Sequence, residues 1–385
     1  MRFAVDAHAI GRHLTGNEVY IRSLLNAFQS QDVDCHFVAY VSASEACSHI
    51  PAGIQTHYVS GNPFRRLGWD LANKVRHDRP DLLHVQYTAP LGCTVPIVVS
   101  VHDVSFLEHP EYFTRLRARQ LRWTVWRTVR RAAKILTVSE FSRASILKVY
   151  PDLEEDQVVM VPNAAGSEFR PVPREVTASA VRERFSVHGP FILSVGDLQP
   201  RKNQIGLIHA FARLARAYPQ LKHSLVFAGK ETWFADRVRE AARESGVRDR
   251  IHFCGFVSDR ELLHLYSACD VSVFPSFYEG FGLPALESMA CGRALVCSNT
   301  SALPEVVDGA ALLVDPYLID DIARAIADLL LDSELRVRME RLGLQRATHF
   351  SWQKTAQRTL EVYREVAERN VASGRRTRPL TTAHQ

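Results

Sequence analysis

The chain has 385 residues, 46% hydrophobic and 23% charged, which is the composition of a folded globular protein rather than of a disordered or fibrous one. This length exceeds what one compact core organises, so we expect two domains. The formal net charge of +5 is mild and argues against a dedicated nucleic-acid-binding protein.

The seven cysteines are scattered, without a Cys-x-x-Cys pair or a histidine at zinc-binding spacing. Most stand in apolar runs, which is typical of small buried side chains in a reducing compartment. Residues 1–6 already have the pattern of a strand, so we expect no signal peptide. No apolar run is long enough to span a membrane. Together these features predict a cytoplasmic protein.

Along the first half of the chain, apolar runs alternate with amphipathic segments. Strands are expected at residues 2–7, 36–41, 82–87, 96–102 and 135–139. The first helix is expected at 17–28, where apolar residues recur at helical spacing. This alternation predicts a parallel sheet covered on both faces. The pattern ends near 161–163, after which Pro171 and Pro173 predict a stiff connector.

A second alternating series follows the connector. Its strands are expected at residues 191–195, 225–228, 251–256, 271–274, 294–298 and 311–314. Helices are expected at 203–217, capped by Asn203, and at 352–369. The chain is therefore divided into a first domain at 1–167, a second domain at 168–350, a terminal helix at 351–370 and a disordered tail at 371–385.

The strongest site signal follows the expected strand at 271–274. The chain turns there through two glycines, Gly280 and Gly282, before a helix begins, and a glycine loop at a helix N-terminus favours anion binding. Glu279 and Glu287 flank this loop, and carboxylates accept strong hydrogen bonds from hydroxyl groups. A nucleotide sugar, with a diphosphate between a ribose and a hexose, has this layout.

A purely structural interpretation competes with this one. Strand, glycine loop and helix recur throughout doubly wound folds, and a carboxylate in the first turns of a helix often only complements the helix dipole. The two carboxylates alone do not decide between the interpretations. The uninterrupted stretch 279–292 resembles the Glu-x7-Glu donor-site motif of retaining glycosyltransferases of family 4; its matching residues are Glu279, Gly280, Phe281, Gly282, Leu283, Pro284, Leu286, Glu287, Met289, Ala290, Cys291 and Gly292.

This resemblance implies the GT-B fold, an α/β architecture in which two Rossmann-like, doubly wound parallel-sheet domains face a central cleft. It implies that Glu279 binds hydroxyl groups of the transferred sugar. The remaining donor-binding residues that it implies in this stretch are Gly280, Phe281, Gly282, Leu283 and Glu287. In the family the terminal helix crosses back onto the first domain, and we expect the same from residue 351 onward.

A loop that begins at Gly196 joins an expected strand to the helix at 203–217, which places Arg201 and Lys202 at the mouth of the crevice. Such a pair on a surface loop is usually solvated. Here it matches the Arg-Lys pair that holds the donor diphosphate in family 4. The resemblance therefore makes Gly196 donor-binding and Arg201 and Lys202 catalytic, since fixed cations stabilise the charge that develops on a leaving diphosphate.

In the first half, Gly16 stands where the first helix begins, and by resemblance it faces the donor phosphate across the cleft. Relatives often carry a second glycine and an arginine where this chain has Asn17 and Glu18. The role of Glu18 therefore stays open between a solvent-facing or helix-capping position and contact with the acceptor.

His102 and Asp103 end the expected strand at 96–102. A histidine at a strand end can simply satisfy a neighbouring carbonyl group. His-Asp at this place matches a family position that lines the sugar subsite, so the resemblance assigns His102 to positioning the sugar and Asp103 to the donor site. It also implies that Phe256 and Val257 border the nucleobase.

Three further stretches match family landmarks. Residues 139–142 and 161–163 are expected to shape the hinge and the cleft wall. Glu305 is expected to be structural.

Retention of anomeric configuration can arise through a covalent glycosyl-enzyme or through front-face displacement. Glu279 is the motif carboxylate nearest the sugar, and in the family it binds hydroxyl groups, so we favour front-face displacement. The leaving phosphate oxygen then takes the acceptor proton. No metal and no cofactor are expected, because the cations and the helix N-terminus neutralise the diphosphate.

The segment 115–131 bears on the acceptor. It contains seven arginines and no acidic residue, interleaved with Trp123, Val125, Trp126 and Val129. Arginine with tryptophan on one amphipathic helix is typical of contact with an anionic membrane. A helix packed on the sheet by its Trp and Val side chains, with a solvated basic face, explains the pattern equally well. The expected localisation is therefore the cytoplasm, with the inner face of the membrane as the alternative.

The leading hypothesis is a retaining, metal-independent glycosyltransferase that uses a nucleoside-diphosphate sugar and a glycan or lipid-linked acceptor. The segment 102–111 is similar to mannosyltransferase-type members in polysaccharide and O-antigen assembly, which favours GDP-mannose. A nucleotide-sugar isomerase of the 2-epimerase kind and a non-catalytic nucleotide-sugar-binding protein are the alternatives. A dinucleotide dehydrogenase is set aside, since no Gly-x-Gly-x-x-Gly follows a strand.

Overall fold

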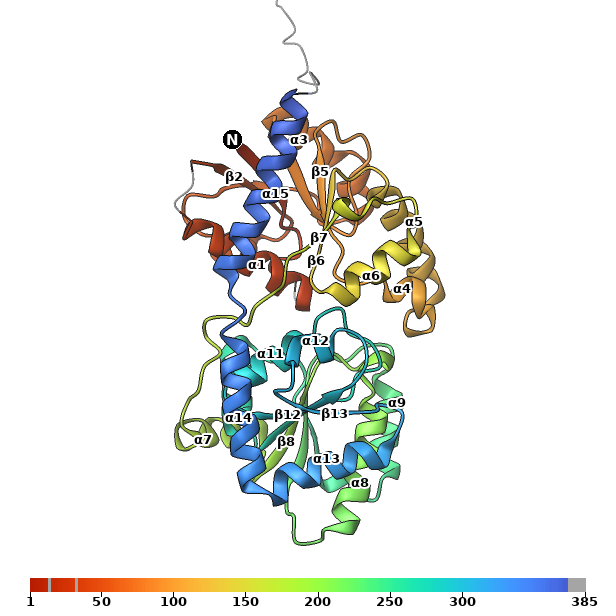
Figure 1. Ribbon diagram of the computed structural model, residues 1–385, viewed down its shortest axis with the longest axis vertical. Helices are drawn as coiled ribbons and strands as arrows, with labels where there is room; N and C mark the ends of the chain where they lie inside the picture. Colours follow the sequence, from red (N-terminus) through yellow and green to blue (C-terminus); the bar gives the residue numbers. More distant parts are fainter. Residues whose placement is uncertain (13–14, 32–33, 373–385) are drawn as a thin grey trace, which may run out of the picture.

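A computed structural model of the chain describes residues 1–12, 15–31 and 34–372. Figure 1 shows two α/β domains stacked along the long axis, each built around one sheet. All strand pairings in both sheets are parallel, as the alternation of strands and helices predicts. The expected α/β architecture of two doubly wound domains is confirmed.

The first domain holds a seven-stranded sheet in the order β3-β2-β1-β4-β5-β6-β7. Its strands are β1 (Arg2–Asp6), β2 (His36–Val41), β3 (Gln55–Tyr58), β4 (Leu82–Gln86), β5 (Ile97–Ser100), β6 (Lys134–Thr137) and β7 (Val158–Met160). The sequence pattern did not predict β3 and β7. Both are edge strands: β3 has no fully buried residue and β7 has three residues, so neither shows a long apolar run.

The second domain holds a six-stranded sheet in the order β10-β9-β8-β11-β12-β13. Its strands are β8 (Phe191–Val195), β9 (Ser224–Ala228), β10 (Ile251–Phe253), β11 (Val271–Phe274), β12 (Ala294–Ser298) and β13 (Leu312–Val314). β10 ends three residues earlier than expected, because Gly255 turns the chain with a φ of +69°.

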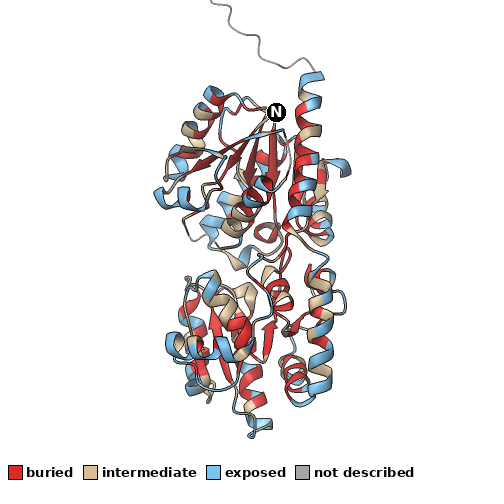
Figure 2. Ribbon diagram, turned by 90° about the vertical axis from the view of Figure 1, so that its left-hand side faces the viewer, coloured by how far each residue is buried: buried red, intermediate tan, exposed pale blue. Residues whose placement is uncertain are grey.

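Helices cover both faces of each sheet, and the buried residues of Figure 2 follow the strands and the helix faces against them. The first domain contains α1 (Thr15–Gln29), α2 (Pro63–Arg65), the π-helical turn η2 (Arg66–Asp70), α3 (Leu71–Asp78), α4 (Ser105–Glu108), η3 (Pro110–Tyr112), α5 (Arg115–Val129) and α6 (Glu140–Val149). The second contains α7 (Arg174–Phe185), η5 (Pro200–Lys202), α8 (Gln204–Ala217), α9 (Ala235–Glu244), α10 (Asp259–Ala268), α11 (Leu283–Ala290), α12 (Leu303–Val307), α13 (Ile319–Leu331) and α14 (Ser333–Ala347). Asn203 caps α8, and its side chain accepts a hydrogen bond from the N–H of Gly206 at 3.2 Å.

The last helix, α15 (Trp352–Ala372), leaves the second domain and packs on the first (Figure 1). Its apolar face joins the core between α1 and the sheet. The ring of Tyr363 lies 5.1 Å from that of Phe3, and its hydroxyl bonds to Nδ1 of His84 at 2.5 Å. Of the tail expected to be disordered, residues 371 and 372 form the exposed end of this helix, and residues 373–385 lie outside the described residues.

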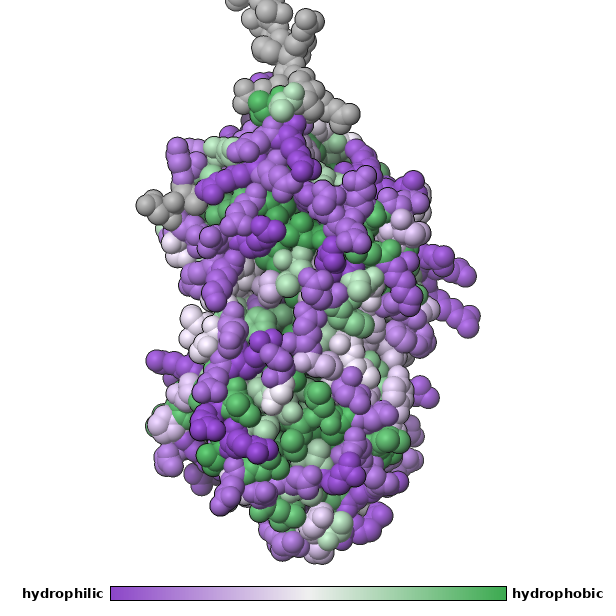
Figure 3. Space-filling model, viewed as in Figure 1, coloured by the Kyte–Doolittle hydropathy of each residue, from purple (hydrophilic) through white to green (hydrophobic). Residues whose placement is uncertain are grey.

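On the face in Figure 3, hydrophilic residues cover most of the surface, and the hydrophobic residues form separate patches on the two domains. In the described part of the chain, no helix combines the length and the apolar character that crossing a bilayer requires.

Candidate functional site

The strongest charge cluster joins the loop after β8 to the loop after β11. Glu279 is buried, and its two carboxylate oxygens bond to Arg201 Nη1 at 2.8 Å and to Lys202 Nζ at 2.5 Å. Arg201 Nη1 also donates to the carbonyl of Tyr278 at 3.1 Å. The loops are further tied by the N–H of Phe277, which donates to the carbonyl of Arg201. Residues more than 70 positions apart in the sequence thus form one buried ionic unit.

Burial alone would raise the pKa of Glu279, but the charges of Lys202 and Arg201 outweigh it and lower that pKa to about 2. The carboxylate is therefore ionised at any physiological pH. It can accept hydrogen bonds but cannot act as a proton donor. Its two cations are held in place by Glu279 before any ligand arrives, which preorganises them toward the cleft.

Gly282 places the N-terminus of α11 beside this cluster. It has a φ of +99°, a conformation that glycine adopts without strain, and a Cβ there would lie 2.6 Å from Leu303 Cδ2. The Phe281 side chain is buried in the core, 5.7 Å from the ring of Phe350, and Leu283 packs against the same core. Only the backbones of Phe281 and Leu283 therefore face a ligand at this helix end.

Glu287 lies one turn into α11 and is 6% exposed. It accepts a hydrogen bond from the hydroxyl of Tyr266 at 3.0 Å. Burial, opposed by the Tyr266 hydrogen bond and reinforced by the carboxylates of Asp259 and Glu168, raises the pKa of Glu287 to about 7. A solvated carboxylate that only complements the helix dipole would not have this pKa.

His102 and Asp103 follow β5 at its carboxyl end. His102 Nε2 lies 3.2 Å from Gln86 Oε1, and its ring contacts that of Tyr20 at 4.6 Å. Burial lowers the pKa of His102 to about 4, so the imidazole is neutral at pH 7. The Asp103 carboxylate accepts hydrogen bonds from the N–H and hydroxyl of Ser105 at 2.9 and 2.6 Å, which fixes the turn into α4.

Gly16 stands exposed in the first turn of α1, and a Cβ added there would meet nothing within 4 Å. Among the described residues, no contact requires glycine at this position. Glu18 accepts a hydrogen bond from the N–H of Gly11 at 2.9 Å, so it ties the loop after β1 to the helix.

One further glycine and an exposed aromatic side chain lie on the second-domain side of the site. Gly196 has a φ of +144°, and Lys202 Cε packs 3.3 Å from where a Cβ would stand, so Gly196 leaves room for the lysine. Phe256 is 48% exposed, with Lys230 Nζ 5.5 Å from the centre of its ring. Val257 is half-buried against the core beside it. Phe256 and Val257 thus form a rim just before α10 begins at Asp259.

Gly280 lies at a close contact between the domains. Its carbonyl accepts hydrogen bonds from the hydroxyls of Ser139 at 2.7 Å and Ser142 at 3.0 Å. A Cβ at Gly280 would overlap the His102 carbonyl oxygen and lie 2.9 Å from Asp103 Cβ. The glycine therefore allows the loop after β11 to touch the end of β5, which brings Glu279 and His102 to the same place.

Glu305 in α12 caps α6 across the domain boundary. Its carboxylate accepts hydrogen bonds from the N–H groups of Glu140 at 2.9 Å and Phe141 at 3.1 Å. Together with the Gly280 contact, this interaction holds the closed arrangement of the domains, a structural role of the kind expected for Glu305.

Tyr87 is a site residue that the sequence pattern missed, because it was counted as the last residue of a strand. It has a φ of +57°, and the N–H of Thr88 donates to the Gln86 carbonyl across it at 2.6 Å. A tyrosine in this region is strained. Its ring lies 5.7 Å from that of His102, and burial and the Asp103 charge, opposed by Arg201, raise its pKa well above the ordinary value. No local sequence signal marks such a turn.

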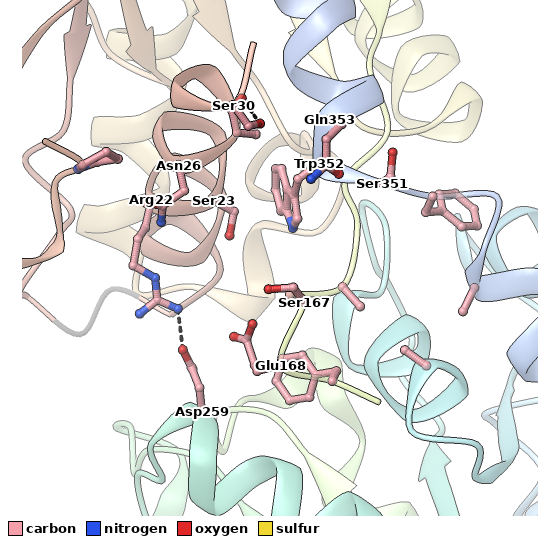
Figure 4. A pocket seen from close by; sticks show the side chains of 18 of the residues that line it. Arg22, Ser23, Asn26, Ser30, Ser167, Glu168, Asp259, Ser351, Trp352 and Gln353 are labelled. Atoms are coloured by element: carbon pink, nitrogen blue, oxygen red, sulfur yellow. Dashed lines mark hydrogen bonds and ion pairs between the residues drawn. The ribbon is translucent and has the colours of Figure 1, made fainter. Parts of the chain in front are cut away.

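Two open cavities lie between the domains. One, of about 500 Å³, is lined by Glu108, His109 and Tyr278. Tyr278 immediately precedes Glu279 in the sequence. The other, of about 880 Å³, lies between α1, α10 and the start of α15 (Figure 4). Arg22 and Asp259 form an ion pair across its edge at 2.5 Å. Within 1–12, 15–31 and 34–372, no three or more His, Cys, Asp or Glu residues are grouped to hold a metal ion.

The chain matches known families over both domains. A family model described as "Glycosyl transferases group 1" matches residues 178–346, and one described as "Glycosyltransferase Family 4" matches residues 14–167. The O-antigen chain mannosyltransferase B of Escherichia coli is 35% identical over 269 residues, which are 69% of this chain and 70% of that protein. The serotype-specific mannosyltransferase WbdA of Escherichia coli is 33% identical over 234 residues, 60% of this chain but 28% of that protein.

Solved structures show the same fold at lower identity. The sucrose-phosphate synthase of Thermosynechococcus elongatus superposes with a TM-score of 0.77 at 20% identity, covering 96% of this chain and 100% of that one. A glycosyltransferase from Rickettsia africae superposes with a TM-score of 0.72 at 17% identity, covering 95% and 98%. The expected GT-B fold is thereby confirmed.

Proposed function

Because this chain belongs to the glycosyltransferases of family 4, we propose that it is a retaining, metal-independent enzyme that transfers mannose from GDP-mannose to a glycan or lipid-linked glycan. The observation that carries the donor class is the buried unit of Arg201, Lys202 and Glu279 beside the N-terminus of α11. The preference for mannose rests on the segment 102–111 and on the names of the two Escherichia coli relatives, which are both mannosyltransferases.

In the proposed reaction, the donor diphosphate lies against Arg201, Lys202 and the first N–H groups of α11. The glycosidic bond to phosphate breaks as the acceptor hydroxyl oxygen bonds to the anomeric carbon. The phosphate oxygen that leaves takes the acceptor proton. Fixed cations and N–H groups stabilise the charge on that oxygen. They also supply the neutralisation that a metal would provide, which supports metal independence.

Front-face displacement is supported by the state of the groups around the sugar. Glu279 is held by two cations with its pKa near 2, so it suits hydrogen bonds from sugar hydroxyls rather than attack on the anomeric carbon. The His102 imidazole is neutral. The His102 carbonyl lies against Gly280 and accepts a hydrogen bond from the Ser142 hydroxyl at 2.9 Å. In this proposal His102 positions the sugar, and its carbonyl stabilises developing positive charge.

The nucleoside would lie along the rim of the second domain. Glu287 would accept hydrogen bonds from the ribose, and the backbone beside Phe256 and Val257 would border the nucleobase. Gly16 would allow the first turn of α1 to approach the phosphates. A lipid-linked acceptor would bring the enzyme to a membrane surface, for which residues 115–131 provide basic and aromatic side chains.

A thermal-shift panel with GDP, UDP and ADP, free and as nucleotide sugars, tests the donor class. Ligand at about a hundred times its Kd adds about 2.7 kcal/mol to the stability of the folded state, a shift of a few degrees in a chain of this size. We expect guanine nucleotides to give the largest shift. A larger shift with UDP would overturn GDP-mannose, and no shift with any nucleotide would overturn the transferase proposal. Conversion of the donor without acceptor would instead identify an isomerase.

Glu287 gives the donor affinity a pH dependence. A ribose hydroxyl donates best to an ionised carboxylate, and the pKa of Glu287 is about 7. The affinity for GDP-mannose is therefore expected to be about tenfold weaker at pH 6 than at pH 8. The Glu287→Gln variant should bind more weakly than wild type at pH 8 and show no such slope. Calorimetric titration at both pH values measures this, and an equal slope in both proteins would contradict it.

Glu287 also makes the stability of the folded protein depend on pH. Donor affinity is expected to rise with pH, whereas this contribution to stability falls. The folded-state pKa of Glu287 lies above its ordinary value of 4.5, so the folded protein binds more protons than the unfolded chain between these values. The contribution of Glu287 to stability is therefore lost as the pH rises from about 4.5 to about 7. Glu287→Gln should remove that loss in a denaturant titration without ligand.

A further inference from the structure

Helix α5 packs on the sheet with its small and β-branched residues rather than with its tryptophans. Ala118, Val125 and Val129 are buried, whereas Trp123 and Trp126 are 58% and 45% exposed. Two indole rings on the solvent side of a helix are not needed for its packing. Val125 and Val129 therefore hold α5 on the sheet, as one interpretation of the sequence expected. The same interpretation is wrong in giving Trp123 and Trp126 that role.

The charge on the same surface is uniformly basic. The segment 115–131 contains seven arginines and no acidic residue. Among the described residues, the ion pair of Arg130 with Asp152 at 3.2 Å is the one carboxylate contact of these seven. The guanidinium groups of Arg127 and Arg130 lie 6.0 and 5.4 Å from the ring centres of Trp123 and Trp126. Cation and aromatic ring thus occur together, as at a membrane interface.

The exposed apolar surface continues beyond α5 onto neighbouring segments. The chain at 88–93 is joined to α5 by the N–H of Ala89, which donates to Thr128 Oγ1 at 2.9 Å, and to η2 by the N–H of Leu91, which donates to the Leu67 carbonyl at 2.7 Å. Leu91 is 46% exposed. In the α2–η2 segment next to it, Phe64 is 81% and Trp69 is 55% exposed, and Arg65 lies 5.9 Å from the Trp69 ring.

This surface adjoins the acceptor side of the cleft. Thr88 follows directly after Tyr87, whose ring lies 5.7 Å from that of His102, and Leu91 comes three residues after Thr88. Helix α5 also packs against α4, which begins two residues after Asp103. A lipid held at this surface would therefore present its head group near the site of transfer.

We infer that the first domain docks on an anionic lipid bilayer through α5 and the segments 63–69 and 88–93. Exposed indole and phenyl rings enter the interface between head groups and acyl chains, and the exposed arginines that have no carboxylate partner among the described residues contact the lipid phosphates. The purpose of the docking, delivery of a lipid-linked acceptor, rests on the proposed function; the docking itself does not.

Vesicle co-sedimentation tests the docking. The probes are phosphatidylcholine vesicles with and without about one third phosphatidylglycerol, at salt concentrations of about 50 mM and about 500 mM. We expect binding to the anionic vesicles at low salt, with loss of most binding at high salt or without phosphatidylglycerol. Absence of binding to anionic vesicles at low salt would overturn the inference.

Matched variants separate this surface from general stickiness. Trp123→Ala/Trp126→Ala is expected to lower the vesicle partition coefficient by about tenfold or more. Trp233→Ala, which removes a 57% exposed tryptophan from the second domain, should leave it unchanged. Equal effects of the two changes would overturn the inference. The inference would also be overturned if the wild type bound double-stranded DNA as strongly as anionic vesicles and the double variant did the same. That result would identify a general polyanion site.

The nucleotide shift keeps the two proposals distinguishable. Trp123→Ala/Trp126→Ala should retain the full thermal shift with GDP-mannose, which also shows that the variant is folded. Wild type that binds vesicles but no nucleotide would refute the proposed function and leave the docking intact. If the wild type binds nucleotide but not vesicles, the docking is refuted and the proposed function is left intact.

Discussion

Lys202→Ala is expected to lower kcat for sugar transfer by about 100- to 1000-fold. Its ammonium group is 13% exposed and lies 2.5 Å from Glu279, so it is fixed beside the place proposed for the diphosphate. Because the leaving group gains negative charge as the glycosidic bond breaks, the cation stabilises the transition state more than the ground state. KM for the donor should therefore change less than kcat. Steady-state kinetics with donor and acceptor varied separately measures both.

The loss has a second explanation that must be separated from the first. Removing Lys202 also leaves the buried Glu279 with Arg201 as its remaining cation, which disturbs the folded site. A disturbed site would weaken donor binding as well as transfer, whereas loss of a cation that acts mainly in the transition state lowers kcat more than donor affinity. If the missing cation causes the loss, Lys202→Ala therefore keeps most of the thermal shift with GDP-mannose; loss of that shift would mean that the disturbed site was responsible. Arg213→Ala, which breaks a surface ion pair with Asp320, is the matched control and should retain activity.

Gly280→Ala is expected to reduce transfer by about 100-fold or more while leaving the second domain able to bind nucleotide. The added Cβ would overlap the His102 carbonyl oxygen and press on Asp103. Both obstacles are close to rigid backbone of the other domain, so the clash cannot be relieved by rotating a long side chain. The domains must then separate, which also breaks the hydrogen bonds of Ser139 and Ser142 to the Gly280 carbonyl.

The proposed reaction uses groups from both domains at one place, since Glu279 belongs to one and His102 to the other. Separation by even about 1 Å at the reacting atoms costs a large part of the rate. The measurements are kcat and the radius of gyration with saturating nucleotide, by small-angle scattering. Gly68→Ala is the control, because a Cβ at Gly68 meets nothing within 4 Å. Wild-type kcat in Gly280→Ala would show that this contact is absent from the active state.

Much of the architecture was predictable because it is encoded in local periodicity. Apolar runs bounded by polar turns placed the central strands β1, β2, β8, β11 and β12 within one residue. The glycine loop before α11 was also recognisable locally, since only glycine adopts the φ of +99° found at Gly282 without strain. The edge strands β3 and β7 were missed, because a strand with one neighbour need not be buried on both faces.

The composition of the site was predictable in part. Arg201, Lys202, Glu279 and Glu287 were all singled out by the resemblance of their surroundings to the donor-site motifs of family 4. That Glu279 binds both cations, and that Glu287 turns instead toward Tyr266, was not predictable. These partners lie far apart along the chain, and their meeting depends on β8 and β11 being neighbours in the sheet.

The sequence by itself determined that this chain forms two parallel α/β domains with a glycine loop at the start of α11, because residue spacing and glycine chemistry act over a few positions. The tertiary structure decided which side chains face one another. It turned Phe281 into the core, exposed Trp123 and Trp126, and set Gly280 against His102. Those outcomes depend on strand order and on the packing of one domain against the other, which bring together residues whose local patterns carry no information about each other.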